Sequence, residues 1–135
     1  NIIELEDRIP EEFHSLLIPK MTLQPLIENA IYHGIRIKEG EKGVVTLRIH
    51  KENQDVYLQV CDSGSGMSQE KIDEMNQSIS RHDETFGYGV RNVNKRIELL
   101  FGKEYGLRFF KNEFGGVTVE IHLPIEGKTE DKGVI

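Results

Sequence analysis

The sequence predicts an α/β fold, a two-layer sandwich in which about three helices pack on a mixed sheet of about five strands. Two periodicities alternate along its 135 residues. In some segments apolar residues recur every three or four positions, the period of one helix face, and in others every second position, the period of a strand. Turn-forming glycines separate these segments. Helices interspersed with strands in this way favour two layers around one core.

The first part of the chain is expected to be mostly extended. Residues 1–9 form the first predicted strand, which ends at Pro10, and residues 11–18 are expected as a short helical turn or loop closed by Pro19. Because the chain begins without Met, we expect it to be a fragment of a longer protein.

The central helix is predicted over residues 21–34. One face is apolar and carries Leu23, Leu26, Ile27, Ala30 and Ile31. The other face carries Pro25, Glu28, Asn29, Tyr32 and His33. Thr22 is expected to cap the start, Pro25 to stand in the first turn where it is tolerated, and Gly34 to end the helix.

A hairpin and a second helix follow a charged loop at residues 38–43. Residues 44–51 and 55–62 alternate apolar and polar side chains, which predicts two antiparallel strands. Ser68 is expected to cap a helix over residues 69–79, because its hydroxyl can accept from a free N–H of the first turn.

A third helix and a second hairpin complete the predicted elements. The helix is expected over residues 90–101 and is stopped by Gly102. Strands over residues 107–112 and 117–123 are joined around a pair of glycines, which is typical of a hairpin turn.

Composition limits the class of protein. The length favours one domain, expected over residues 1–126, with residues 127–135 as a disordered tail that has little to bury. The net charge of −6 and the lack of a basic run argue against nucleic-acid binding. No apolar run approaches the ~20 residues of a membrane span. The single Cys61 fits a reducing compartment, and the five histidines lack metal-ligand spacing.

Three motifs carry the functional prediction: Glu28-Asn29-Ala30 on the central helix, Asp62-Ser63-Gly64-Ser65-Gly66-Met67 after a strand, and Gly87-Tyr88-Gly89 before a helix. In this order they resemble the asparagine box and the two glycine boxes of the ATP-binding domain of sensor histidine kinases. That family has a Bergerat-type ATP-binding fold, shared with gyrase, Hsp90 and MutL. Residues 18–34 resemble most the subgroup of bacterial membrane sensors typified by LytS and YesM. The resemblance covers residues 9–124.

Asn29 is the sharpest single residue. Read alone, an asparagine on the polar face of a helix is more often simply solvated. The resemblance implies that its carbonyl oxygen binds Mg²⁺, which holds the phosphates of ATP, and Mg²⁺ does prefer oxygen ligands. Tyr32 and His33 share the face of Asn29. The resemblance puts His33 against the nucleotide, and capping of the helix C-terminus is an equal alternative.

Asp62 ends a strand and begins a glycine-rich turn, which in most proteins is an ordinary Asx-turn. The resemblance implies that Asp62 accepts a hydrogen bond from the exocyclic amine of adenine, since a carboxylate selects a base that donates. Gly64 and Gly66 permit the positive φ angles and close backbone approach that such a pocket requires. Met67 is either a wall of the pocket or part of the core.

Gly87, Gly89 and Val90 open a helix whose first N–H groups are a ready site for phosphate. A dinucleotide fingerprint is excluded, because no hydrophobic strand precedes these residues and Asn92 stands at the third glycine position. Residues 80–86 match the mobile lid of the family. Thr118 is near the position of a family hydroxyl at the adenine, with its register shifted by one.

Pro25 discriminates between members of the superfamily. The hydrolysing members and the anti-sigma-factor serine kinases have, one turn before the asparagine, a Glu that acts as general base, and Pro25 can take no proton. A histidine acceptor already offers a lone pair and needs no such base. No catalytic residue is therefore assigned. Glu28 is kept as a candidate, although it points about 100° away from Asn29.

The resemblance implies a histidine kinase fragment that binds ATP and Mg²⁺ and transfers the γ-phosphate to a histidine on a separate upstream helical domain of the same parent. A response regulator would follow. The parent is implied to be a homodimeric integral membrane sensor, with this domain in the cytoplasm and not itself touching the membrane. The alternatives are an anti-sigma-type serine kinase, an ATP-driven clamp, and a nucleotide sensor without transfer activity.

Overall fold

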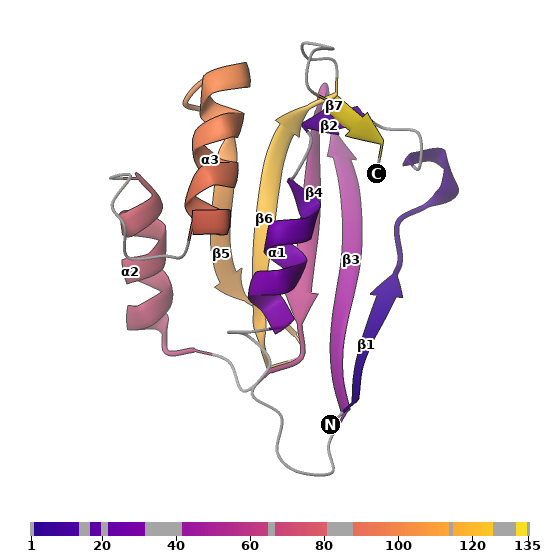
Figure 1. Cartoon of the computed structure of the whole chain (residues 1–135), viewed down its shortest axis with the longest axis vertical. Coiled ribbons are helices and arrows are strands. Elements are labelled where there is room, and N and C mark those ends of the chain that lie inside the picture. The colour runs from indigo at the N-terminus through magenta and orange to yellow at the C-terminus, as the bar shows by residue number, and fades with distance from the viewer. Residues whose placement is uncertain are drawn as a thin grey trace.

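The computed structural model describes residues 2–13, 17–19, 22–31, 42–64, 67–80, 88–113, 115–125 and 132–134. It has two layers, a five-stranded sheet and three helices that cover one of its faces (Figure 1). The predicted fold class is thereby confirmed. None of the described helices has the length and apolar character that crossing a bilayer requires.

The sheet is mixed, with the order β1-β3-β4-β6-β5. Its strands are β1 (Ile2–Asp7), β3 (Lys42–Glu52), β4 (Asp55–Asp62), β5 (Gly106–Lys111) and β6 (Val117–Pro124). β1 runs parallel to β3, and the other neighbours are antiparallel. β3 begins two residues before the predicted strand, because Lys42 and Gly43 pair with β1.

Two helices each have one end where it was predicted, α2 its start and α3 its end. α2 (Gln69–Ser80) is capped by Ser68, whose Oγ accepts from the backbone N–H of Lys71 at 3.1 Å. α3 (Tyr88–Phe101) ends at Gly102, which has a φ of 114°. Its start lies two residues before the predicted position.

The central helix is α1 (Leu23–Asn29), shorter at its start than predicted. The expected cap by Thr22 is wrong: Thr22 has helical backbone angles, and its side chain makes no capping hydrogen bond. The physical reason is burial, since Thr22 is only 2% exposed and packs inward instead of bending back over the first turn. Residues 32–41 lie outside the described part, so the predicted end at Gly34 stays a prediction.

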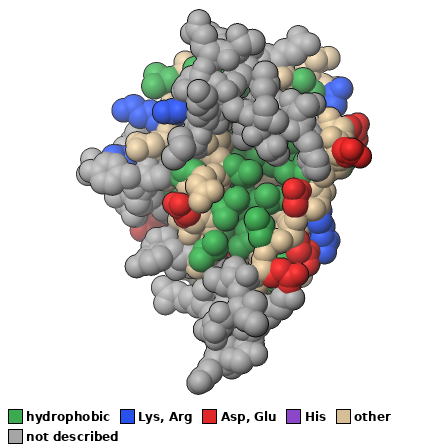
Figure 2. All heavy atoms as spheres, turned by 45° about the vertical axis from the view of Figure 1, so that its right-hand side comes forward, with side chains coloured by type: hydrophobic (Ala, Val, Ile, Leu, Met, Phe, Trp, Pro, Cys, Tyr) green, Lys and Arg blue, Asp and Glu red, His purple; other side chains and the backbone are tan. Residues whose placement is uncertain are grey.

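The core lies between the sheet and the helices. Alternate residues of β4 point into it, as the burial of Val56, Leu58 and Val60 shows. Leu26 of α1 and Ile97 of α3 are fully buried against this face. On the side of the molecule that carries β1 and β3, hydrophobic side chains reach the surface (Figure 2).

The opposite face of the sheet is polar, and none of the described helices lies over it. Tyr57 of β4 stacks between His50 of β3 and His122 of β6, with ring centroids 4.8 Å and 4.5 Å apart. Such cross-strand pairs stabilise neighbouring strands. His122 Nε2 also lies 2.8 Å from Asp55 Oδ2, which ties β6 to the start of β4.

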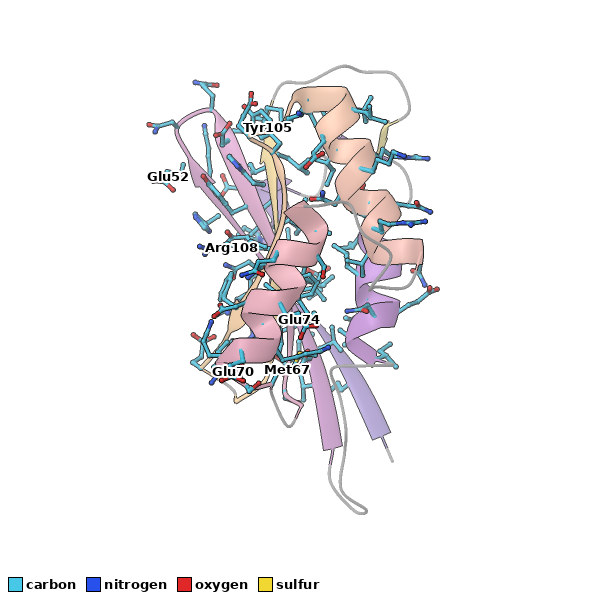
Figure 3. All side chains as sticks on the ribbon, turned by 90° about the vertical axis from the view of Figure 1, so that its left-hand side faces the viewer. Glu52, Met67, Glu70, Glu74, Tyr105 and Arg108 are labelled. Atoms are coloured by element: carbon cyan, nitrogen blue, oxygen red, sulfur yellow. The ribbon has the colours of Figure 1, made fainter. Side chains whose placement is uncertain are left out.

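The edge strand β5 is bonded on its outer side by two asparagine side chains. The N–H of Leu107 donates to Asn94 Oδ1 at 2.9 Å, and the N–H of Phe109 donates to Asn76 Oδ1 at 2.8 Å. Asn76 Nδ2 returns a bond to the carbonyl of Phe109. Figure 3 views this edge, with α2 in front and Arg108 of β5 beside it. α2 and α3 are thus fixed to the backbone of β5.

The segment predicted as a tail contains a further strand. β7 (Lys132–Val134) pairs antiparallel with β2 (Leu17–Pro19). A short 3₁₀ turn at Glu11–Phe13 precedes β2 in the chain. The observed strand pair differs from the prediction, which gave a loop for the first segment and a disordered tail for the second. Pairing between segments so far apart in the chain leaves no local pattern in the sequence. Residues 126–131 lie outside the described part.

Candidate functional site

A small cavity, about 10 Å³ in volume, lies between the end of α1 and the end of β4. It is lined by Asn29, Ala30, Val60, Asp62, Met67, Met75, Phe109, Val117 and Val119. Asn29, Asp62 and Met67 come from two of the three predicted motifs and meet here. Most of the remaining lining is apolar, as expected of a site for a flat base.

Asp62 places a buried carboxylate in this cavity, with 4% of the residue exposed. Its Oδ1 accepts from the N–H of Gly64 at 3.0 Å, which is the expected Asx-turn, and from the N–H of Val117 at 3.1 Å. No hydrogen bond from the described residues reaches Oδ2. Burial raises the pKa of Asp62, and the two N–H donors act in the opposite direction. One oxygen is thus held by the fold, and the other is left as an acceptor.

The β5–β6 hairpin packs directly onto Asp62. A Cβ added to Gly116 would lie 2.1 Å from the backbone oxygen of Asp62, so this position tolerates only glycine. Asn112 Nδ2 donates to that same oxygen at 3.0 Å. Neither residue was predicted as part of the site. The available signal was turn chemistry, since an asparagine shortly before two glycines favours a tight turn.

Thr118 is fully buried but lies on the other face of the sheet. Its neighbours Val117 and Val119 line the cavity, and alternation along β6 turns Thr118 away. Its Oγ1 accepts from Asn112 Nδ2 at 3.1 Å. The structure therefore links Thr118 to Asp62 through Asn112 and does not bring its hydroxyl into the cavity.

The end of α1 separates Asn29 from Glu28. Asn29 and Ala30 line the cavity. Glu28 is exposed, and its Oε1 accepts from Gln24 Nε2 at 3.1 Å on the outer side of the helix. Glu28, the candidate catalytic residue, is therefore not brought to Asn29, as the helical step of about 100° per residue requires.

The remaining predicted residues divide into two groups. His33, Gly66 and Gly87 lie outside the described residues. Gly89 and Val90 stand in the first turn of α3, with the side chain of Val90 in the core. Any ligand at this helix end would meet backbone N–H groups, which have no partner within the helix.

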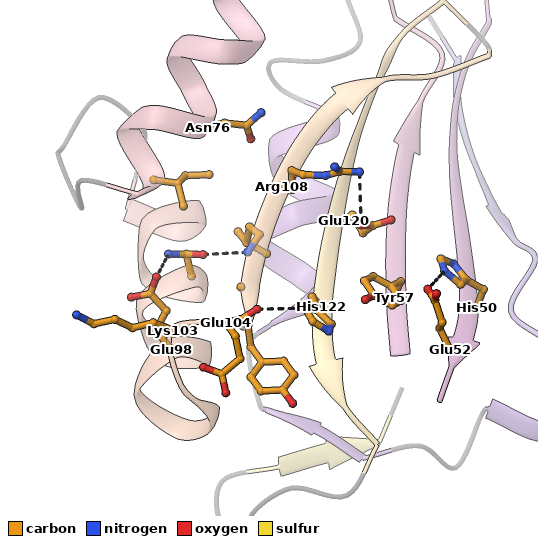
Figure 4. Close-up of a pocket in the computed structure, with 15 residues that line it drawn as sticks. His50, Glu52, Tyr57, Asn76, Glu98, Lys103, Glu104, Arg108, Glu120 and His122 are labelled. Atoms are coloured by element: carbon orange, nitrogen blue, oxygen red, sulfur yellow. Dashed lines mark hydrogen bonds and ion pairs between the residues drawn. The ribbon is translucent and has the colours of Figure 1, made fainter. Parts of the chain in front are cut away.

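A second and larger hollow, about 670 Å³, opens around β5 and the polar face of the sheet (Figure 4). It includes Tyr57, Tyr105 and His122 and none of the predicted motif residues. Its polar groups bond largely to one another, for example Asn94 to Glu98 and Arg108 to Glu120. The smaller cavity is therefore the candidate site.

Curated relatives of this chain are sensor kinases. The sensor protein LytS of Staphylococcus haemolyticus is 30% identical over 131 residues, and the sensor protein kinase HptS of Staphylococcus aureus is 30% identical over 126 residues. Each comparison covers 93% of this chain and 22% or 24% of the relative. The chain thus spans less than a quarter of the length of these relatives.

Solved structures share the fold. The catalytic domain of histidine kinase ThkA matches with a TM-score of 0.63 at 20% identity, over 94% of this chain and 81% of that one. The mycobacterial sensor histidine kinase MprB matches with a TM-score of 0.63 at 16% identity, over 93% and 84%.

A family model agrees with these relatives. The model described as histidine kinase-, DNA gyrase B-, and HSP90-like ATPase matches residues 18–127. The resemblance of this chain to sensor histidine kinases is confirmed. The chain belongs to the family of histidine kinase-, DNA gyrase B- and HSP90-like ATPases.

Proposed function

We propose that this chain is the ATP-binding catalytic domain of a two-component sensor histidine kinase. The observation that carries the proposal is the meeting of Asn29 and Asp62, from separate motifs, in one mostly apolar cavity. The apolar walls suit a purine ring, and the two polar groups suit its orientation. Because the cavity is only about 10 Å³, these walls must move apart to admit the ring.

Asp62 would select the base. Gly64 and Val117 hold Oδ1, and Oδ2 is left to accept from the exocyclic amine of adenine. A carbonyl at the same position of the base would meet an acceptor instead of a donor, so inosine or guanosine nucleotides would bind less well.

Asn29 would be the protein ligand of Mg²⁺. Its amide oxygen belongs to the donor class that Mg²⁺ prefers, and this ion needs only one or two protein oxygens beside the phosphates. No group of three or more acidic, histidine or cysteine side chains suited to a metal occurs among the described residues, which fits an ion held mainly by the nucleotide. When bound, Mg²⁺ offsets the charge of the phosphates.

Pro25 supports transfer to histidine over hydrolysis. It stands in the first turn of α1, one helical turn before Asn29, where it offers no proton acceptor. In the transfer, a lone pair of a neutral imidazole nitrogen would form the new bond to the γ-phosphorus. The bond to the leaving oxygen would break, and ADP would depart. The role left to this chain is to hold and orient the nucleotide.

The acceptor histidine would lie on an upstream helical domain of the same parent, with a response regulator as the next acceptor. The parent would be a homodimeric membrane sensor with this domain in the cytoplasm. The names of the relatives, sensor protein LytS and sensor protein kinase HptS, support a sensor kinase as the parent.

A labelling experiment tests the division of labour. With γ-labelled ATP, the isolated chain should bind nucleotide and acquire no acid-labile label. Addition of the helical segment in trans should produce label on that segment, because it supplies the acceptor histidine, which this domain then only has to meet in the correct orientation. Label on the isolated chain would contradict the proposal. ATP binding without any transfer, even with the segment, would favour a nucleotide sensor.

The metal assignment has its own test. Asn29→Ala should weaken ATP binding much more in Mg²⁺ than in EDTA, because the lost group contacts the ion and not the base. Calorimetry under both conditions measures this. Glu28→Ala, one residue earlier and on the outer side of α1, is the matched control and should leave both affinities unchanged. Equal losses for Asn29→Ala with and without Mg²⁺ would remove Asn29 from the metal site.

A further inference from the structure

We propose that Asn112 is a positioning residue, which sets the direction in which Asp62 presents its free carboxylate oxygen to the base. The inference rests on the proposed role of Asp62 in adenine binding. Asn112 follows β5, lies outside the three motifs, and does not line the cavity. Any effect on the nucleotide must therefore be indirect, and among the residues that Asn112 positions only Asp62 offers a polar group to distinguish one base from another.

The donor side of the Asn112 amide ties two strands together. Nδ2 donates to the backbone oxygen of Asp62 at 3.0 Å, at the end of β4. It also donates to Thr118 Oγ1 at 3.1 Å, on β6. One amide group thus fixes the backbone of Asp62 relative to the start of β6.

The acceptor side of the same amide shapes the hairpin. Asn112 Oδ1 accepts from the N–H of Gly116 at 3.1 Å, and the N–H of Asn112 donates to the carbonyl of Gly116. The next residue, Val117, is the one whose N–H donates to Asp62 Oδ1. Asn112 therefore determines where this N–H lies.

The orientation of the carboxylate depends on that N–H. With both Gly64 and Val117 donating to Oδ1, rotation of the carboxylate would break two bonds. If the hairpin shifts and the Val117 bond is lost, only the local Asx-turn remains. The free oxygen then has no fixed direction, and the preference for a base that donates should fall.

Asn76 provides a matched control on the same edge strand. Its amide also makes two bonds to backbone, both to Phe109 of β5, and neither reaches Asp62. Asn76→Ala removes an amide that joins α2 to the backbone of β5, and Asn112→Ala removes one that joins the end of β4 to the β5–β6 hairpin. Their effects on stability should be similar, and only Asn112 should affect the choice of base.

The experiment measures the ratio of affinities for ATP and inosine triphosphate, together with thermal unfolding. Asn112→Ala should reduce this ratio about five- to ten-fold, the loss of one oriented hydrogen bond. Asn112→Asp keeps the shape and the acceptor for Gly116 but places an oxygen against the Asp62 carbonyl, so it should reduce the ratio as well. Asn76→Ala should lower the unfolding temperature and leave the ratio unchanged.

Three outcomes are decisive. An unchanged ratio of ATP to inosine triphosphate affinity in Asn112→Asp would overturn the inference. This variant also decides the question if Asn112→Ala does not fold. An equal fall in Asn76→Ala would show a general loss of structure and would overturn it too. Asp62→Asn is measured in parallel: an unchanged ratio there would refute the adenine role of Asp62 itself, and with it the basis of the inference.

Discussion

Asp62→Asn should bind ATP about ten- to hundred-fold more weakly than the parent chain, the effect of losing a hydrogen bond to a charged group. The two N–H donors at Oδ1 require an acceptor there, so the new amide must place its NH₂ group where Oδ2 was. That group would face the amine of adenine, donor against donor. Calorimetry measures the loss, and an unchanged affinity in a folded variant would refute the assignment of Asp62.

The same variant should be more stable than the parent chain at neutral pH. Burial raises the pKa of Asp62 above the ordinary 3.8, so the folded state favours the protonated carboxyl. The contribution of Asp62 to stability is then most favourable below pH 3.8 and is lost as pH rises through the raised value. Asparagine carries no charge at neutral pH or in acid, so its own contribution does not change with pH. The stability gain in thermal unfolding should therefore vanish in acid, and a gain that persists there would contradict the burial argument.

Gly116→Ala should destabilise the domain by about 1–3 kcal/mol or more and remove ATP binding. Its Cβ would lie 2.1 Å from the backbone oxygen of Asp62 and 2.3 Å from Oδ1. Because the nearest atom belongs to the backbone of β4, no side-chain rotation relieves the clash, and the hairpin must move away from the cavity.

The neighbouring glycine supplies the control for this prediction. An added Cβ at Gly115 meets nothing within 4 Å, and its φ of 83° is one that asparagine tolerates. Gly115→Asn should therefore keep both the fold and ATP binding. Thermal unfolding and calorimetry on the two variants distinguish the effect of the close contact between Gly116 and Asp62 from the effect of the turn conformation at Gly115. Equal behaviour of both variants would show that the approach to Asp62 does not matter.

The spacing of apolar residues along the sequence predicted the elements whose buried face repeats regularly, such as β4 and α1. The alternation in β4 gave its bounds correctly, because every second residue faces the core. The same strand delivered Asp62 to the edge of the sheet. The helical period put Asn29 about 60° around the helix from the buried Leu26, at the border between the buried and the polar side. Thr22 failed as a cap because packing, which a local pattern does not contain, outweighed its capping propensity.

The parts of the site that were missed depend on contacts between distant segments. Asn112 and Gly116 matter because the β5–β6 hairpin lies on the end of β4, some fifty positions away in the chain, as the Asn112 bond to Asp62 shows. The pairing of β2 with β7 is missing from the prediction for the same reason. Thr118 was expected at the base, but the strand register puts its side chain behind the pocket wall.

The two asparagines on the outer side of β5 have a consequence for self-association. An edge strand invites another chain to continue the sheet, because its outward N–H and C=O groups lack partners. The N–H of Leu107 already has a partner in Asn94, and both the N–H and the C=O of Phe109 have partners in Asn76. A foreign strand would have to displace both amides and detach β5 from two helices. The sheet therefore resists growth at this border, and among the described strands β1 forms its other border, where a neighbouring chain would meet no such amides.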